Sequence, residues 1–196
     1  MKRIGIASFV IVLFVFGLLG CGGLRYSQTD ADANNFHPKR IGVLPIEIGT
    51  YEEARETADL IVAGTLVEKK WFNDIVAGDT MKTMLLSNEA LRKTVLDYTV
   101  KLKTVNFSDP DLSKIIGETA KVDAFLIVNV DYWFYTKEND EKIAKVGFGI
   151  KLVEADTGKI MWKAGHHLDD SYKFIKPALP DVAKKLIKQL LAEMPH

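Results

Sequence analysis

Residues 124–135 read Ala-Phe-Leu-Ile-Val-Asn-Val-Asp-Tyr-Trp-Phe-Tyr and form the most strand-like part of this 196-residue chain. The run begins apolar on both faces, as a central strand does, and then alternates less strictly as aromatic residues take over. Residues 146–152 carry a large apolar residue at every second position, which predicts a strand with one covered face. Asp156-Thr157-Gly158-Lys159 predicts a hairpin turn, after which residues 160–164 return as the partner strand. We therefore expect an antiparallel meander of three strands.

Short apolar strands and amphipathic helices alternate before this meander. Residues 40–46 and 72–77 have the composition of buried strands, and residues 54–66 carry small and apolar side chains at helical spacing. Asp109-Pro110 predicts a helix start, because proline is favoured at the first helical position, where its missing N–H costs nothing. A last amphipathic helix, residues 179–194, is expected to cover the sheet. This order predicts an α/β fold: a three-layer sandwich with a mixed sheet of about five strands, helices on both faces, and a C-terminal three-stranded antiparallel meander followed by a covering helix.

The N-terminus has the layout of an export signal. Lys2 and Arg3 precede an unbroken run of apolar and small residues from Ile4 to Leu19, which is too short to span a bilayer comfortably. The run ends in Leu18-Leu19-Gly20-Cys21, which resembles the lipobox of bacterial lipoproteins. That resemblance implies signal cleavage between Gly20 and Cys21, and a covalent diacylglycerol and N-acyl chain on Cys21. The alternative is an ordinary secretory signal with an incidental cysteine.

We expect three regions in the chain. They are a signal peptide over residues 1–20, a lipidated cysteine and flexible tether over residues 21–36, and a single globular domain over residues 37–196. Gly22 follows the cysteine, and an aspartate there would favour retention at the inner membrane in enteric-type bacteria. The expected location is therefore the outer membrane, with the lipid anchor facing the periplasm. In a host with one membrane it is the outer face of the cytoplasmic membrane.

The composition argues against several classes of function. Lysine and arginine number 26 and aspartate and glutamate also number 26, and this balance argues against nucleic acid as a partner, because phosphate binding requires clustered basic excess. Cys21 is the only cysteine, so acylation of its thiol excludes an intrachain disulfide and a cysteine nucleophile. The sequence has no Gly-x-Ser-x-Gly, phosphate-loop or His-Glu-x-x-His motif. We expect no enzymatic activity, no catalytic residues and no cofactor other than the acyl chains.

The order of elements resembles a known family. Val43-Leu44-Pro45 ends a strand, residues 120–127 lead from a helix into another strand, and residues 152–162 form a hairpin around Asp-Thr-Gly-Lys and Trp162. Over roughly residues 39–194 the chain is similar to the periplasmic lipoprotein domain shared by the curli secretion channel lipoprotein (CsgG), the Pel polysaccharide export lipoprotein and the TolB amino-terminal domain, and to uncharacterised lipoproteins grouped with them. The resemblance implies a three-layer sandwich, lipid attachment, a non-enzymatic role and, in many members, ring-shaped oligomers in an export machine.

One face of residues 124–135 is the candidate partner interface. If the alternation continues along this strand, Asn129, Asp131, Trp133 and Tyr135 share a face that mixes polar and aromatic side chains. Aromatic residues are enriched at interfaces, so we predict contact with a partner there. The alternative is plain core on both sides of the strand.

The candidates for a metal site are His166, His167, Asp169 and Asp170, because imidazoles and carboxylates lie close together in this short stretch. If the strand from Ile160 continues, the two imidazoles point to opposite faces and cannot share an ion. We therefore expect a solvated strand end and no metal.

The function expected from these features is that of a lipid-anchored envelope protein that acts as a binding or assembly component, with a secretion or export complex as the candidate assembly. Its partners would be the membrane through the anchor, and other copies of the chain or other envelope proteins. Two alternatives stay open: an envelope hydrolase with an unrecognised carboxylate site, and a channel-forming export lipoprotein. The channel is disfavoured because the connections are too short to hold extra membrane hairpins.

Overall fold

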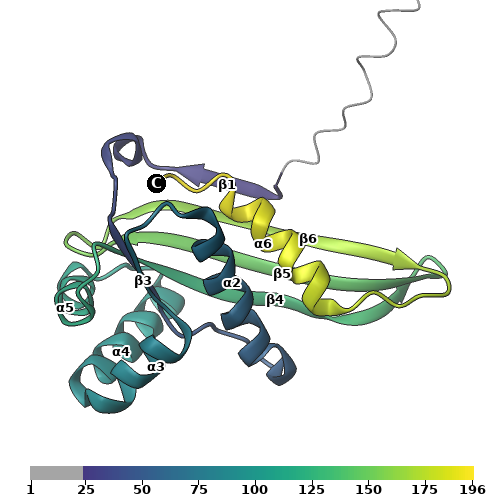
Figure 1. The fold of residues 1–196 in the computed structure, drawn as a ribbon, viewed down its shortest axis with the longest axis horizontal. Coiled ribbons are helices and arrows are strands. Elements are labelled where there is room, and N and C mark those ends of the chain that lie inside the picture. The colour runs from purple at the N-terminus through teal and green to yellow at the C-terminus, as the bar shows by residue number, and fades with distance from the viewer. Residues whose placement is uncertain (1–23) are drawn as a thin grey trace, which may run out of the picture.

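The computed structural model of the protein describes residues 24–196, and the predicted signal cleavage and lipidation site at Gly20 and Cys21 lies outside this part. The described chain forms one mixed sheet of six strands in the order β1-β6-β5-β4-β2-β3, with helices packed on it (Figure 1). None of the helices in residues 24–196 is long and apolar enough to cross a membrane.

The elements follow one another in the order that the sequence predicts, with one strand added at the start. They are β1 (Tyr26–Thr29), the 3-10 helix η2 (Ala31–Asn35), β2 (Arg40–Val43), the 3-10 helix η3 (Glu52–Ala54), α2 (Arg55–Lys69), β3 (Asp74–Val76), α3 (Gly78–Ser87), α4 (Glu89–Val105), α5 (Pro110–Ala120), β4 (Ala124–Glu138), β5 (Glu141–Glu154), β6 (Ile160–Tyr172) and α6 (Leu179–Leu191).

The sheet combines a parallel part with an antiparallel meander. β2 lies between β3 and β4 and runs parallel to both. β4, β5 and β6 form the predicted antiparallel meander, in which β4 and β5 pair from Ala124 and Glu154 to the turn at Asn139 and Asp140. Both turn residues have left-handed φ angles, which match the right-handed twist of a two-residue hairpin.

The sixth strand corrects the sequence-based prediction. Residues 26–29 were expected to belong to a flexible tether, but they form β1, which pairs antiparallel with β6 at the edge of the sheet. All four side chains of β1 are exposed. Its place in the sheet rests on backbone hydrogen bonds, which hydrophobic periodicity does not report.

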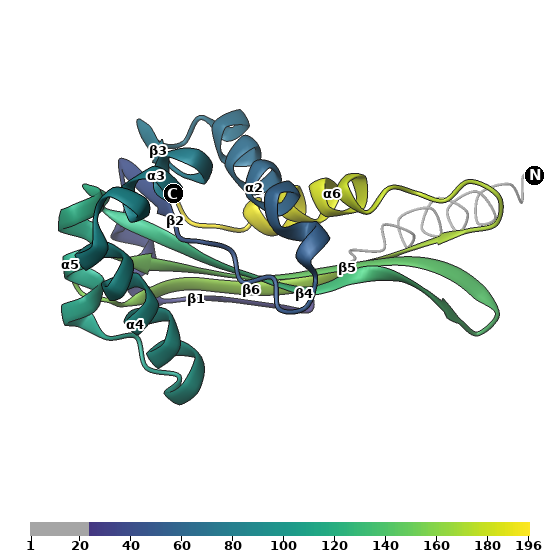
Figure 2. The same cartoon turned by 90° about the horizontal axis from the view of Figure 1, so that it is seen from below.

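Two apolar cores lie on the two faces of the sheet (Figure 2). The first core fills the space between the sheet and the helices α2 and α6, where Trp162 and Phe148 are fully buried. The wide apolar stripe of α6 covers β5 and β6, as its helical spacing predicts. The second core joins α4 and α5 and part of α3 to Phe125 of β4 and Val153 of β5.

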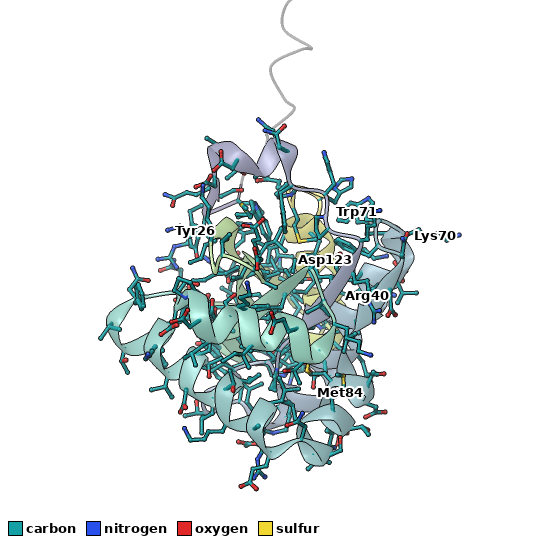
Figure 3. All side chains as sticks on the ribbon, turned by 90° about the vertical axis from the view of Figure 1, so that its left-hand side faces the viewer. Tyr26, Arg40, Lys70, Trp71, Met84 and Asp123 are labelled. Carbon is teal, nitrogen blue, oxygen red and sulfur yellow. The ribbon has the colours of Figure 1, made fainter. Side chains whose placement is uncertain are left out.

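Asp123 links the first residues of the parallel strands of the sheet through hydrogen bonds. Its Oδ2 atom accepts hydrogen bonds from the backbone N–H groups of Lys39 (2.8 Å) and Arg40 (2.9 Å), just ahead of β4. The guanidinium of Arg40 in turn lies 2.8 Å from the carboxylate of Asp74 in β3. Asp123 and Arg40 lie side by side in Figure 3, and they join the first residues of three neighbouring strands.

The predicted helix start at Asp109-Pro110 is confirmed. The Asp109 carboxylate accepts hydrogen bonds from the backbone N–H groups of Asp111 and Leu112, both at 3.1 Å, and so satisfies two donors at the start of α5. Asp109 also accepts a hydrogen bond of 2.6 Å from the ammonium group of Lys101 in α4. This pair links the two helices of the second core.

Candidate functional site

One face of the sheet is covered by helices only at one end. The second core occupies the end where β2 and β4 begin, under α4 and α5. Among residues 24–196, no helix covers the rest of this face, over the later part of β4 and over β5, β6 and β1 (Figure 2). We call this bare surface the open face; its side chains include those of Tyr26, Asn129, Asp131, Tyr132, Phe134, Lys145, Lys151, Lys163 and His167.

A β-bulge decides which residues of β4 reach the open face. The register with β5 shifts between Val130 and Tyr132, so Asp131 is an extra residue without a pairing partner. A bulge of this kind reverses the alternation beyond it. Asn129 therefore lies on the open face before the bulge, and Tyr132 and Phe134 lie there after it. The Asn129 side-chain amide donates a hydrogen bond of 2.5 Å to the Asp131 carboxylate, which confirms that these two share a side.

The predicted interface of Asn129, Asp131, Trp133 and Tyr135 is therefore wrong as a single face. Trp133 is 2% exposed and packs edge-to-face on Phe148 in the core under α6, with ring centroids 6.4 Å apart. Tyr135 packs against the same core. Regular alternation would place all four residues together, and the one-residue bulge at Asp131 separates them into two pairs.

Three glycines form the floor of the open face. They are Gly147 and Gly149 in β5 and Gly165 in β6, and the last two are direct partners across the strands. A Cβ atom at these positions would lie only 2.5–2.6 Å from atoms of Tyr132, Asn129 and Tyr26, respectively. The absence of side chains thus lets those three groups lie flat on the sheet.

Desolvation shifts the pKa values of three side chains on the open face, although no helix covers them. Desolvation raises the pKa of the Asp131 carboxyl, although the hydrogen bond from Asn129 acts in the opposite direction. Desolvation also lowers the pKa of Lys151, with the nearby Lys163 adding to the shift. Burial likewise raises the pKa of Tyr26. The shifts of Asp131 and Lys151 favour their neutral forms, so the charged forms of these two groups have a cost in solvation on this face.

A groove of about 620 Å³ borders the open face, between α4, β4 and the segment that follows β2. Its polar side chains come from Glu47, Thr99, Lys103, Asn106, Asn129, Asp131 and Lys151. Glu47 forms an ion pair with Lys103 across the groove. The two carboxylates of the groove thus each have a partner, Lys103 for Glu47 and Asn129 for Asp131.

The metal candidates lie next to one another in the second half of β6. His167 pairs with Gly147 and His166 with Phe148, and their ring centroids are 5.8 Å apart, because the His166 ring turns to accept a hydrogen bond of 3.1 Å from the backbone N–H of Arg25. The nearest ammonium groups bind the two carboxylates: Lys145 lies 3.5 Å from Asp169, and Lys185 lies 3.6 Å from Asp170. Within the described part of the chain, no three His, Cys, Asp or Glu side chains are grouped so that they could hold a metal ion.

Sequence reasoning missed Tyr26, Tyr132, Phe134 and Lys151 as members of the open face. The glycines at 147, 149 and 165 are a signal in the sequence that could have indicated a flat floor. The bulge has no such signal, because Val-Asp-Tyr is compatible with an unbroken strand. The hydrophobic pattern likewise gives no indication of the edge strand that carries Tyr26.

The α/β sandwich of the described chain is a fold that solved bacterial proteins share. The chain is similar to PelC from Paraburkholderia phytofirmans, solved as a dodecamer, with a TM-score of 0.56 and 16% identity over 87% of this chain and 96% of that chain. It is also similar to lipoprotein GNA1162 from Neisseria meningitidis, with a TM-score of 0.53 and 12% identity over 79% of this chain and 99% of that chain.

A third similar structure is the hypothetical protein CT253 from Chlamydia trachomatis, with a TM-score of 0.51 and 8% identity over 78% of this chain and 93% of that chain. No family model matches the sequence, and no curated protein matches it. At these identities the similarity establishes the fold alone. The PelC fold confirms the architecture that the sequence resemblance implies.

Proposed function

We propose that this protein is a lipid-anchored component of the bacterial cell envelope whose domain works by binding and not by catalysis. The acyl chains on Cys21 hold it at the outer membrane on the periplasmic side, or at the outer face of the cytoplasmic membrane in a host with one membrane. The domain binds other copies of itself or another envelope protein, as a component of a secretion or export assembly.

The observation that carries the binding role is the open face. The rings of Tyr26 and Tyr132 lie flat there on the glycine floor, beside Asp131 and Lys151, whose pKa values are shifted by desolvation although no helix covers them. A flat surface of aromatic and polar groups is typical of protein interfaces. A partner that supplies hydrogen bonds to these groups would offset the cost of their desolvation.

Self-association is supported by the fold. PelC, which has this fold, is a dodecamer in its solved structure. In the groove beside the open face, Glu47 is paired with Lys103 and Asp131 accepts a hydrogen bond from Asn129.

Crosslinking in cells tests the binding role. A photoreactive amino acid replaces Tyr132 on the open face, and in a matched control it replaces Leu60, which is 74% exposed on α2. We expect adducts from position 132 that are absent from position 60, and adducts of twice the chain mass if the partner is a second copy. Equal adducts, or none, from both positions would contradict the role of the open face.

Metabolic labelling with an alkyne fatty acid tests the anchor separately. Wild-type protein should take up the label and the Cys21→Ala variant should not. Equal labelling of the two would reject the anchor and leave the crosslinking result untouched.

A further inference from the structure

The loop between β6 and α6 exposes two large apolar side chains side by side. Phe174 is 96% exposed and Ile175 is 86% exposed, the highest values among the large hydrophobic residues of the described chain. The flanking residues are Lys173 and Lys176, so the loop reads Lys-Phe-Ile-Lys. Two adjacent apolar side chains with almost full exposure mark a candidate contact with a partner outside the domain, because their exposure to water is unfavourable.

This loop is held in place, and Tyr135 of β4 is the residue that holds it. The Tyr135 hydroxyl donates a hydrogen bond of 2.9 Å to the carbonyl of Pro177, where the loop ends. Its ring packs edge-to-face on Tyr172, where the loop begins, with centroids 6.3 Å apart. The ammonium group of Lys176 lies 3.4 Å from the centre of the same ring. The loop therefore presents its two apolar side chains from a fixed base.

The loop lies at one end of the molecule, beside the turn between β4 and β5 and away from α4 and α5 (Figure 1). That neighbouring turn, residues 137–142, is polar and charged throughout, so the apolar character of this end is confined to the pair at 174 and 175. Lys173 beside the pair suits a contact with a lipid surface, since the stem of a lysine can lie among the acyl chains while its charge reaches the headgroups.

The direction of β1 relates this loop to the lipid anchor. β1 runs antiparallel to β6, and Tyr26 pairs with Gly165. Residues that precede Tyr26 therefore start out toward the C-terminal end of β6, where the loop begins. Cys21 is five residues before Tyr26, and five residues reach at most about 17 Å. The start of β1 and the loop at 174–175 thus lie toward the same end of β6.

We propose that the apolar pair Phe174–Ile175 inserts into the lipid bilayer and forms a second membrane contact of this protein, which fixes the orientation of the domain against the leaflet. The proposal takes the membrane location from the proposed function. One acyl-modified residue at the end of a chain leaves the domain free to rotate, whereas two separate contacts hold one side of it against the lipid. The open face then keeps a constant orientation toward its partner.

Tryptophan fluorescence of the full acylated chain in vesicles tests this contact. The vesicles contain phosphatidylethanolamine and phosphatidylglycerol, with or without bromine atoms on the acyl chains, and the variant is Phe174→Trp. The control is Leu86→Trp, which replaces a side chain that is 72% exposed on α3. The emission of the wild type, with its own Trp71, Trp133 and Trp162, is subtracted from both.

We expect the added emission of Trp at position 174 to shift to the blue and to be lost in the brominated vesicles, while that of the Leu86→Trp control stays as in water. Emission at position 174 that is unshifted, or that is shifted but not quenched by bromine, would overturn the proposal, because the side chain would then lie in water or against protein. Equal unfolding midpoints of both variants and the wild type verify that the fold is kept.

The mass of the intact purified protein separates this result from the anchor. If the chain carries the acyl mass but position 174 is not quenched, the proposed loop contact is rejected and the anchor is supported. If the chain lacks the acyl mass but position 174 is still quenched, the loop contact is supported and the anchor is rejected.

Discussion

The bulge at Asp131 makes a sharp prediction about two neighbouring aromatic residues. Trp133→Ala should lower the free energy of unfolding far more than Tyr132→Ala, because the bulge places Trp133 in the core and Tyr132 on the open face. A strand without the bulge predicts the opposite placement for Trp133.

The magnitude follows from the burial of the indole. A buried tryptophan removes roughly 150–250 Å² from water, and at about 25 cal/mol per Å² this is worth about 4–6 kcal/mol. Measured losses for truncation of buried aromatic residues to alanine are about 3–5 kcal/mol. Tyr132 is half-buried and lies flat over Gly147, so its removal should cost about 1 kcal/mol.

Equilibrium unfolding in urea measures both values. The two variants should keep the slope of the wild type and differ in midpoint, which attributes the change to stability alone. Deletion of Asp131 is the third variant: it removes the unpaired residue, leaves Tyr132 paired with Gly147 and Trp133 paired with Val146, and should therefore keep Trp133 in the core and lose less stability than Trp133→Ala. A Tyr132→Ala loss that equals or exceeds that of Trp133→Ala would refute the assignment of the faces.

The remaining predictions use the same unfolding measurement. Gly158→Ala should lower the free energy of unfolding by roughly 1–3 kcal/mol, because Gly158 has a φ of +69° and an added Cβ would lie 2.9 Å from a backbone atom of Pro110. Gly64→Ala should raise the free energy of unfolding by about 0.5–1 kcal/mol, because Gly64 is exposed in α2 with open space around it. Changes of the same sign in the two variants would contradict the turn geometry. Asp123→Ala should lose about 1.5–3 kcal/mol by leaving two backbone N–H groups without an acceptor, and a loss below about 0.5 kcal/mol would show that they find another. The hydrogen bond from Lys101 lowers the pKa of Asp109, so the stabilisation is complete above the unfolded-state pKa of about 3.9 and is lost as the pH falls through the lower folded-state pKa. Asp109→Asn should therefore flatten the decline of stability in acid, and an unchanged decline would remove Asp109 as its source.

Much of the fold could be predicted because its signals are local. The alternation in residues 146–152, the Asp-Thr-Gly-Lys turn and the stripe of α6 each depend only on neighbouring residues, and the meander and its covering helix follow from them. The lipobox at Cys21 remains a prediction from the sequence alone.

The candidate site was predicted only in part, because its composition depends on events that have no local signal. The insertion of one residue at Asp131 replaces Trp133 and Tyr135 on the open face by Tyr132 and Phe134. Tyr135, expected at an interface, instead holds the loop after β6 through a hydrogen bond to Pro177. An unbroken strand and a bulged strand share one sequence pattern, and packing under α6 selects between them.

The sequence by itself determined the order of the strands and helices, their amphipathic faces and the layout of the N-terminus, since the periodicity and composition of a segment belong to that segment. Only the tertiary structure decided that residues 26–29 complete the sheet, that one half of a sheet face stays bare, and that Phe174 and Ile175 are left almost fully exposed. These three outcomes depend on which distant segments meet, and contacts between distant segments are set by the packing of the whole chain.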